Sequence, residues 1–254
     1  MQKRVTDEDI KKKLEKIKVR IAVMSGKGGV GKSTMSALLA LHYAKEGKKV
    51  GLLDADLTGP SIPHLFGLID KTVGYGKDGF EPVLTQKYKI KVMSMQFLLP
   101  DKEMPVIWRG PLQAGVLREF LGRTNWGELD YMIIDLPPGT GDMPLTVMQD
   151  AKPNGVVVVA TPQELTSVIV EKAINMANAT ETHVIGLVEN MTYYVCPNCG
   201  HKSYIFGKSR AIELAKKYGI EYYTELPIDP KLLELADNGK IEDYETDYFY
   251  QFPF

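Results

Sequence analysis

A glycine-rich segment starting at Gly26 has the residue types and spacing of a phosphate-binding loop. Two glycines bracket four residues directly before Lys32 and Ser33. Glycines let backbone N–H groups turn inward around phosphate oxygens at the positive end of the following helix. We expect Lys32 to reach the β- and γ-phosphates and the Ser33 hydroxyl to bind Mg²⁺. The expected nucleotide-binding residues of this loop are Gly26, Lys27, Gly28, Gly29, Val30, Gly31, Lys32, Ser33 and Thr34.

Acidic residues follow two apolar runs and are positioned to complete such a site. Asp54 and Asp56 come after the run 50–53, and Asp135 ends a second run. Asp135 is interpreted as a Walker B carboxylate that holds Mg²⁺ through water. Asp56 is favoured for orienting the attacking water and Asp54 for the Mg²⁺ shell. The reverse order also fits the sequence.

The nucleotide base is predicted to be adenine. A guanine-specific Asn-Lys-x-Asp segment would offer an aspartate to guanine N1 and N2. The residues after the apolar run 183–188 read Glu-Asn-Met-Thr-Tyr and hold no such aspartate. Asn190 has the donor and acceptor needed for a bidentate contact with an adenine edge. ATP is therefore the preferred nucleotide.

The only two cysteines, Cys196 and Cys199, form a Cys-x-x-Cys turn followed by Gly200. Such a turn directs two thiolates at one metal ion or cluster. Two thiolates are half of a tetrahedral site, and a homodimer supplies the other pair across its two-fold axis. Zinc in a four-thiolate site and a redox dithiol remain alternatives. Haem attachment is excluded because Gly200 separates Cys199 from His201.

Alternating apolar runs and helical stretches surround these motifs. Strands are expected at 19–24, 50–53, 90–95, 131–136, 156–160 and 183–188, and helices at 6–17, 32–46, 164–179 and 208–218. Near-continuous apolar strands are typical of a parallel sheet that is buried on both faces. We therefore predict an α/β fold, with a doubly wound, mostly parallel sheet and helices on both faces. The segment 67–89 is expected to be an irregular excursion, and the cysteine turn a loop before the next helix.

The chain is expected to form one P-loop domain over 19–240, preceded by a charged helix within 1–18 and followed by an acidic, aromatic tail over 241–254. The tail is expected to pack on the domain or on a sister subunit, with a docking peptide as the alternative. Lys and Arg total 31 against 32 Asp and Glu, so no overall charge favours nucleic acid or an anionic membrane. No apolar run reaches the ~18 residues of a membrane span, and the charged start lacks the apolar core of a signal peptide, so we expect a cytoplasmic protein.

The run 25–34 resembles the deviant, two-lysine Walker A loop of the MinD/Mrp/nitrogenase-iron-protein superfamily, which belongs to the SIMIBI-like P-loop NTPases. This resemblance implies an ATP-sandwich homodimer in which Lys27 crosses the interface and contacts the partner's nucleotide. Further motifs resemble the Mrp/ApbC family of iron–sulfur carrier ATPases. They are the runs 56–63, 108–111 and 135–142 and the Cys-Pro-x-Cys-Gly turn. Pro227 resembles the segment of that family that packs against the base.

The resemblance extends from about Val19 to Pro230 and implies a [4Fe–4S] cluster held by Cys196 and Cys199 of both subunits. It also implies delivery of the cluster to apo-proteins, linked to ATP hydrolysis with slow intrinsic turnover. The N-terminal ferredoxin-like cysteines of the eukaryotic Nbp relatives are absent. A zinc-clamped, MinD/ParA-like regulatory ATPase is the main alternative. A positioning ATPase that resembles MinD or ParA and cycles on membrane or DNA would require a basic C-terminal helix or patch, whereas this C-terminus is acidic and aromatic. A third alternative is an electron donor like the nitrogenase iron protein. In that protein the two cluster cysteines of each subunit lie far apart in sequence, whereas Cys196 and Cys199 share one turn.

Overall fold

The computed structural model describes residues 4–76, 79–99, 110–163 and 168–252. Within these residues, nine strands form one sheet in the order β10-β9-β8-β1-β7-β2-β6-β5, with β11 also paired to β9. The strands are β1 (Ile17–Ser25), β2 (Val50–Asp54), β5 (Val83–Leu84), β6 (Lys91–Met93), β7 (Leu129–Asp135), β8 (Gly155–Ala160), β9 (Val184–Val195), β10 (Lys202–Ser203) and β11 (Tyr222–Pro227). Only β5 and β10 pair antiparallel within this described sheet. The prediction of a mostly parallel sheet is confirmed.

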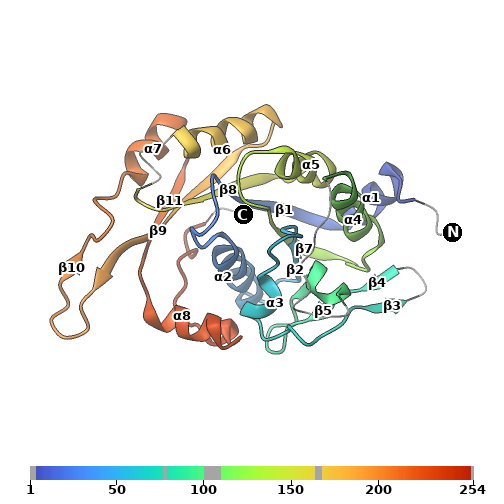
Figure 1. The fold of residues 1–254 in the computed structure, drawn as a ribbon, viewed down its shortest axis with the longest axis horizontal. Coiled ribbons are helices and arrows are strands. Elements are labelled where there is room, and N and C mark those ends of the chain that lie inside the picture. The colour runs from blue at the N-terminus through green and yellow to red at the C-terminus, as the bar shows by residue number, and fades with distance from the viewer. Residues whose placement is uncertain (1–3, 77–78, 100–109, 164–167, 253–254) are drawn as a thin grey trace.

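Helices cover both faces of the sheet (Figure 1). They are α1 (Asp7–Leu14), α2 (Lys32–Lys45), α3 (Ile62–Leu65), α4 (Gly110–Arg123), α5 (Asp142–Ala151), α6 (Val168–Ala179), α7 (Ala211–Tyr218) and α8 (Pro230–Asp237). Figure 1 shows α1, α4, α5, α6 and α7 on one face and α2, α3 and α8 on the other, so the doubly wound arrangement is also confirmed. None of the described helices combines the length and apolar character that crossing a bilayer requires.

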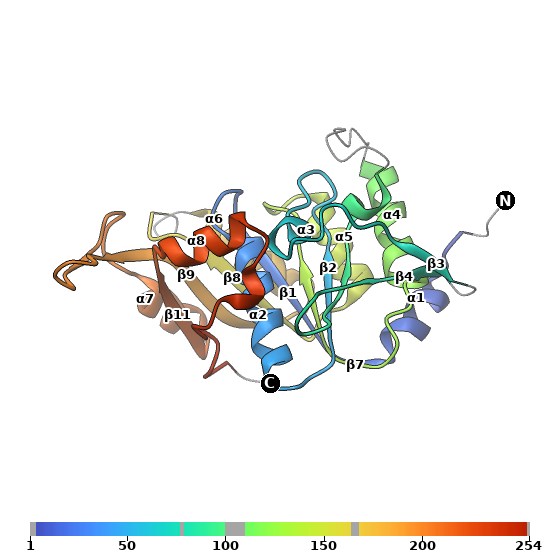
Figure 2. The same cartoon turned by 90° about the horizontal axis from the view of Figure 1, so that it is seen from below.

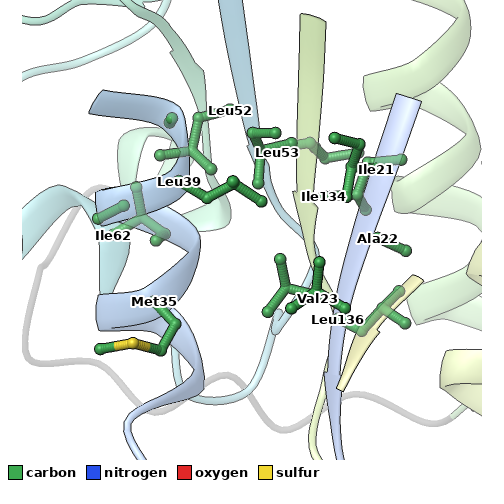
Figure 3. Packing of buried hydrophobic residues seen from close by; sticks show 14 of the residues in the cluster. Ile21, Ala22, Val23, Met35, Leu39, Leu52, Leu53, Ile62, Ile134 and Leu136 are labelled. Carbon is green, nitrogen blue, oxygen red and sulfur yellow. The ribbon is translucent and has the colours of Figure 1, made fainter. Parts of the chain in front are cut away.

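The core lies on both sides of the central strands. Every residue of β2 and β8 is buried, which explains why these strands read as continuous apolar runs. Figure 3 shows the packing between α2, which contributes Met35 and Leu39, and the strands that carry Val23 and Leu53. In register, Asp135 of β7 pairs with Val23 on one side and with Asp54 on the other. The parallel pairing thus brings the two predicted carboxylates together at one edge of the sheet.

Several expected elements differ from the structure. The strand expected at 183–188 continues to Val195, so the segment after it is strand rather than loop. The expected irregular segment 67–89 contains the hairpin β3 (Gly74–Gly76) and β4 (Gly79–Glu81) as well as β5. Strand β11 was not predicted, because its half-exposed residues do not form an apolar run. Trp108 and Arg109 of the motif 108–111, and the first residues of the helix expected at 164–179, lie outside the described residues.

The C-terminal tail packs on α2 and β9 of its own chain (Figure 2). Phe249 is only 2% exposed, and the Lys45 Nζ donates to the Tyr244 carbonyl over 2.7 Å. The Asp247 carboxylate lies 2.8 Å from the His42 imidazole. A Cβ added to Gly186 would lie 2.5 Å from the Phe252 ring, so the ring lies directly on the β9 backbone. The tail aromatics therefore extend the core of the same chain.

We expect Phe249→Ala to lower the free energy of unfolding by about 3–5 kcal/mol, because it removes a fully buried ring. The neighbouring Tyr250 is 71% exposed, so Tyr250→Ala is the matched control and should change stability by less than about 0.5 kcal/mol. Urea unfolding followed by circular dichroism measures both. Equal effects of the two changes would contradict the packing of the tail.

Candidate functional site

The glycine-rich loop joins β1 to α2 and has the backbone shape that phosphate binding needs. Gly29 and Gly31 adopt φ values of 83° and 85°, which side-chain-bearing residues rarely adopt. Gly31 precedes the first residue of α2 and offers no side-chain cap. The first N–H groups of α2 are therefore not satisfied by a capping side chain, and the helix dipole favours an anion there.

The predicted Walker carboxylate, Asp135, is fully buried and forms the centre of a hydrogen-bonded cluster. Its oxygens accept from Lys32 Nζ at 2.7 Å and from the Ser33 hydroxyl at 2.6 Å. The Ser36 hydroxyl also donates to it, at 2.7 Å. Phosphate and Mg²⁺ would bind the same groups of Lys32, Ser33 and Asp135, so these three residues are already assembled. Ser36 was not predicted, although it lies one helical turn after Lys32 and hence on the same side of α2.

Asp54 and Asp56 occupy different environments. Asp54 is fully buried, and its carboxylate accepts from the Ser94 hydroxyl at 3.0 Å. Burial and the neighbouring Asp135 raise the pKa of Asp54 to about 8, while Lys32 acts in the opposite direction. Asp56 is half-buried, and its Oδ1 accepts from the Thr58 hydroxyl at 3.0 Å. Asp56 thus faces a more open environment than Asp54.

A cavity of about 290 Å³ lies over the glycine-rich loop. Its lining residues come from the first turn of α2 and from the segments at the ends of β1, β2 and β7, where parallel α/β sheets bind their ligands. They are Ser25, Lys27, Gly28, Gly29, Gly31, Lys32, Ser33, Thr34, Asp56, Gly59, Ser61 and Pro138. The Gly139 N–H donates to the Ser25 carbonyl at 3.0 Å and ties two of these loops together. Asp54, Asp135, Asn190 and Pro227 are not among the lining residues.

Asn190 lies beneath the phosphate loop. Its Nδ2 donates to the Val30 carbonyl at 2.9 Å, and its Oδ1 accepts from the Met191 N–H at 3.0 Å. Both ends of the amide therefore hold backbone groups, a role the sequence did not indicate. Pro227 ends β11, where it pairs with Tyr193 of β9. The adenine contact of Asn190 and the base packing of Pro227 remain predictions.

The two cysteines lie in the turn of the β9–β10 hairpin, not in a loop before a helix as the sequence suggested. The Gly200 N–H donates to the Cys196 carbonyl at 2.9 Å, and the Cys196 N–H donates to the His201 carbonyl at 3.0 Å. Backbone N–H groups of Cys199 and Asn198 hydrogen-bond to the Cys196 sulfur and lower the pKa of its thiol. Cys199 is exposed. The turn therefore favours a thiolate that a metal can reach.

The cysteine turn holds only part of a metal site. Across the described part of the chain, no group of three or more His, Cys, Asp or Glu side chains is arranged to hold a metal ion. Cys196 and Cys199 therefore supply two ligands, and a tetrahedral or cluster site requires more from elsewhere.

Glu189 is an unpredicted, fully buried carboxylate next to Asn190 on β9. One oxygen accepts from the Arg210 N–H at 3.4 Å, and the other has no hydrogen-bond partner among the described residues. Burial raises the pKa of Glu189, although hydrogen bonds from Ser209 and Arg210 oppose the shift. The Glu189 carboxyl group of the folded protein therefore keeps its proton at pH values where the same group in the unfolded chain has lost it.

This shift predicts the sign of a pH effect. Because the folded-state pKa of Glu189 is raised, its contribution to stability falls as the pH rises from the ordinary glutamate value of 4.5 through the folded-state pKa. Glu189→Gln should remove that part of the pH dependence, so its stability relative to the wild type increases from pH 4 to pH 8. Urea unfolding across this range measures the effect. The exposed Glu213→Gln is the control, and a parallel profile for Glu189→Gln and the wild type would refute the prediction.

The loop between β1 and α2, the carboxylate at the end of β7 and the mostly parallel sheet together define a P-loop nucleoside-triphosphatase. The chain belongs to the ParA family described as "NUBPL iron-transfer P-loop NTPase", whose model matches residues 16–250. This membership confirms the family resemblance seen in the motifs.

Related proteins share most of the chain. An "iron-sulfur cluster carrier protein" of Aquifex aeolicus is 46% identical over 91% of this chain, which spans 63% of that relative's length. A "cytosolic Fe-S cluster assembly factor NUBP2 homolog" of Dictyostelium discoideum is 44% identical and shares 94% of this chain and 90% of its own.

Solved structures show the same fold. A nucleotide-binding protein of Archaeoglobus fulgidus, in complex with ADP and with cobalt found in it, is 65% identical. The match has a TM-score of 0.91 and covers 99% of this chain and 98% of the other. MinD of Aquifex aeolicus, at 21% identity and a TM-score of 0.61, covers 91% of each chain and shows the fold alone.

Proposed function

We propose that this chain is an ATP-hydrolysing carrier of iron–sulfur clusters that works as a homodimer. Cys196 and Cys199 of two subunits would hold a bridging [4Fe–4S] cluster as cargo and pass it to apo-proteins. The observation that carries the proposal is the exposed cysteine turn with its lowered Cys196 pKa, in a chain that also holds an assembled phosphate site. The names of the Aquifex and Dictyostelium relatives support the same role.

A second subunit would complete the cysteine site. Each chain offers two thiolates, and a [4Fe–4S] cluster binds four. A two-fold axis beside the β9–β10 hairpin would bring two identical turns together. Exposure of the turn also suits transfer, because a receiving protein must reach the cluster. We propose a cytoplasmic location, supported by the name of the Dictyostelium relative, and neither nucleic acid nor membrane as a partner.

The phosphate site would hydrolyse ATP with Mg²⁺ as cofactor. Oxygen donors suit Mg²⁺, and the Ser33 hydroxyl and the Asp135 carboxylate lie 2.6 Å apart at the loop. Bound Mg²⁺ would neutralise charge on the phosphates. Lys32 would leave Asp135 to contact the phosphates. Asp56, on the cavity wall, would orient the attacking water.

Other residues would support hydrolysis from further away. Asp54, buried beside Asp135, would act on the Mg²⁺ shell. Lys27 lines the cavity and would act on the partner's nucleotide. Asn190 and Pro227 would contact the adenine base. Intrinsic turnover would be slow, because the site is complete only in the dimer.

Two lysine variants test this division of roles. Lys32→Ala should abolish nucleotide binding, because it removes the group that holds the phosphates. Lys27→Ala should bind nucleotide within a few-fold of the wild type but hydrolyse ATP at least about tenfold more slowly, because its charge acts in the transition state. Lys48 is exposed and does not line the cavity over the phosphate loop, so Lys48→Ala should match the wild type in both measurements. Equal hydrolysis by Lys27→Ala and Lys48→Ala would refute the role of Lys27.

Anaerobic reconstitution with iron and sulfide tests the cargo. The wild type should take up about four irons and four sulfides per dimer, with the visible absorption of a cluster. Cys196→Ala/Cys199→Ala should take up none, and Asn198→Ala, in the same turn, should retain uptake. One zinc per dimer without iron–sulfide uptake would refute the carrier function. It would support the second candidate, a zinc-clamped regulatory ATPase of MinD/ParA type.

A further inference from the structure

A single strand, β9, connects the phosphate loop to the cysteine turn. Strand β9 carries Asn190 beneath the phosphate loop and ends at Val195, directly before Cys196. Figure 1 shows β9 running from the sheet, beside β8, out to the hairpin with β10. No flexible segment separates the residue that contacts the phosphate loop from the first cysteine.

The contact between β9 and the phosphate loop is close and buried. Asn190 is 7% and Val30 1% exposed, and the hydrogen bond from Asn190 Nδ2 to the Val30 carbonyl measures 2.9 Å. A Cβ added to Gly31 would lie 2.3 Å from the same Nδ2 atom. Phosphate is bound by inward-pointing N–H groups of this loop, so the Val30–Gly31 peptide must hold a defined orientation when nucleotide is bound. Asn190 therefore holds the carbonyl of a peptide that belongs to the phosphate loop itself.

Strand β9 is irregular just after this contact. Met191 has a φ of 59°, a backbone conformation that is rare for a residue with a side chain. The register of β9 with β11 shifts opposite this segment, between Glu225 and Pro227. The Thr192 hydroxyl donates to the Glu189 carbonyl at 2.7 Å, within the bulge. A bulge lets a strand change direction. Surrounding contacts, including the one to Val30, hold this conformation against its local preference.

Beyond the bulge, hydrogen bonds continue to the cysteine turn. The Ile228 N–H donates to the Tyr193 carbonyl at 2.7 Å. Tyr194 and Val195 pair with β10, and the Cys196 N–H donates to the His201 carbonyl. These hydrogen bonds join the hairpin to the end of β9. A change of direction at Met191 would be transmitted to the orientation of the cysteines.

We propose that Asn190 is the positioning residue that couples the phosphate loop to the cysteine turn. Loss or rearrangement of its hydrogen bond to Val30 changes the bulge at Met191 and, through the hairpin, the exposure of Cys196 and Cys199. The inference rests on the proposed function in taking these thiols as the cargo site. Coupling free energy is reciprocal, so occupation of the thiols changes nucleotide affinity by the same factor.

The test uses the thiols themselves. Cys196 and Cys199 are the only cysteines, so alkylation of the reduced, metal-free protein by iodoacetamide reports on this turn alone. The rate is measured without nucleotide and with Mg·ADP at a concentration that saturates each variant. We expect the wild-type rate to change about fivefold or more on saturation. The two rates are compared as a ratio, the alkylation rate with saturating Mg·ADP over the rate without nucleotide. In Asn190→Ala, and in the isosteric Asn190→Asp, which lacks the hydrogen-bond donor, this ratio should fall close to one.

Asn238→Ala is the matched control, because Asn238 caps the C-terminus of α8 and its Nδ2 donates to the backbone carbonyl of Glu234 at 2.7 Å. It should keep the wild-type ratio. If Asn190 only contacted the base, its substitution would weaken nucleotide binding but leave the rate ratio at saturation unchanged. A wild-type ratio of one, or an unchanged ratio in both Asn190 variants, would overturn the proposal.

Met191→Gly provides a second route should both Asn190 variants fail to fold or to bind nucleotide. It keeps the Asn190 side chain and relaxes the backbone of the bulge, because glycine adopts positive φ freely. The ratio should fall towards one, and an unchanged ratio would overturn the proposal. None of these measurements uses a cluster. Failure of iron–sulfide reconstitution would therefore leave the coupling intact, and loss of the coupling would leave the carrier function intact.

Discussion

The buried Asp135 carboxylate is the constraint on which the site depends. A charge without water requires partners, and Lys32, Ser33 and Ser36 of α2 supply them. The same bonds fix the start of α2 against the end of β7 and so shape the phosphate loop. Under the proposed function, nucleotide binding would exchange these internal partners for phosphate and Mg²⁺.

Sequence patterns predicted the centre of the molecule well. The strands of the parallel sheet are buried on both faces, so each appears as an apolar run, and the glycine-rich loop and Asp135 stand at their ends. The patterns failed where polar residues are buried by local contacts. Glu189, Asn190 and Thr192 read as the start of a loop, yet they lie buried inside β9, where the side chains of Asn190 and Thr192 donate to backbone carbonyls. Partners such as Ser36 and Ser94 become visible only when the elements are placed in three dimensions.

The C-terminal tail and the β9–β10 hairpin differ in their exposure to solvent. Tail aromatics such as Phe249 are buried against α2 and β9, and they add to a core that one domain already provides. The β9–β10 hairpin instead extends away from the helix-covered strands, and Tyr204 and Ile205, which follow β10, are exposed. The tail is thus covered by its own chain, whereas the hairpin presents its cysteines to solvent.

The strand order also determines when the phosphate loop can form during synthesis. Strand β1, which leads into this loop, lies between β7 and β8 in the sheet. Its neighbours are encoded far later, at Leu129–Asp135 and Gly155–Ala160. Strand β1 is therefore translated well before either neighbour exists, and parallel pairing over such long sequence separations is itself slow. The ability to bind nucleotide is therefore acquired only after β7 and β8 have been made, although the glycines of the loop are translated well before either strand.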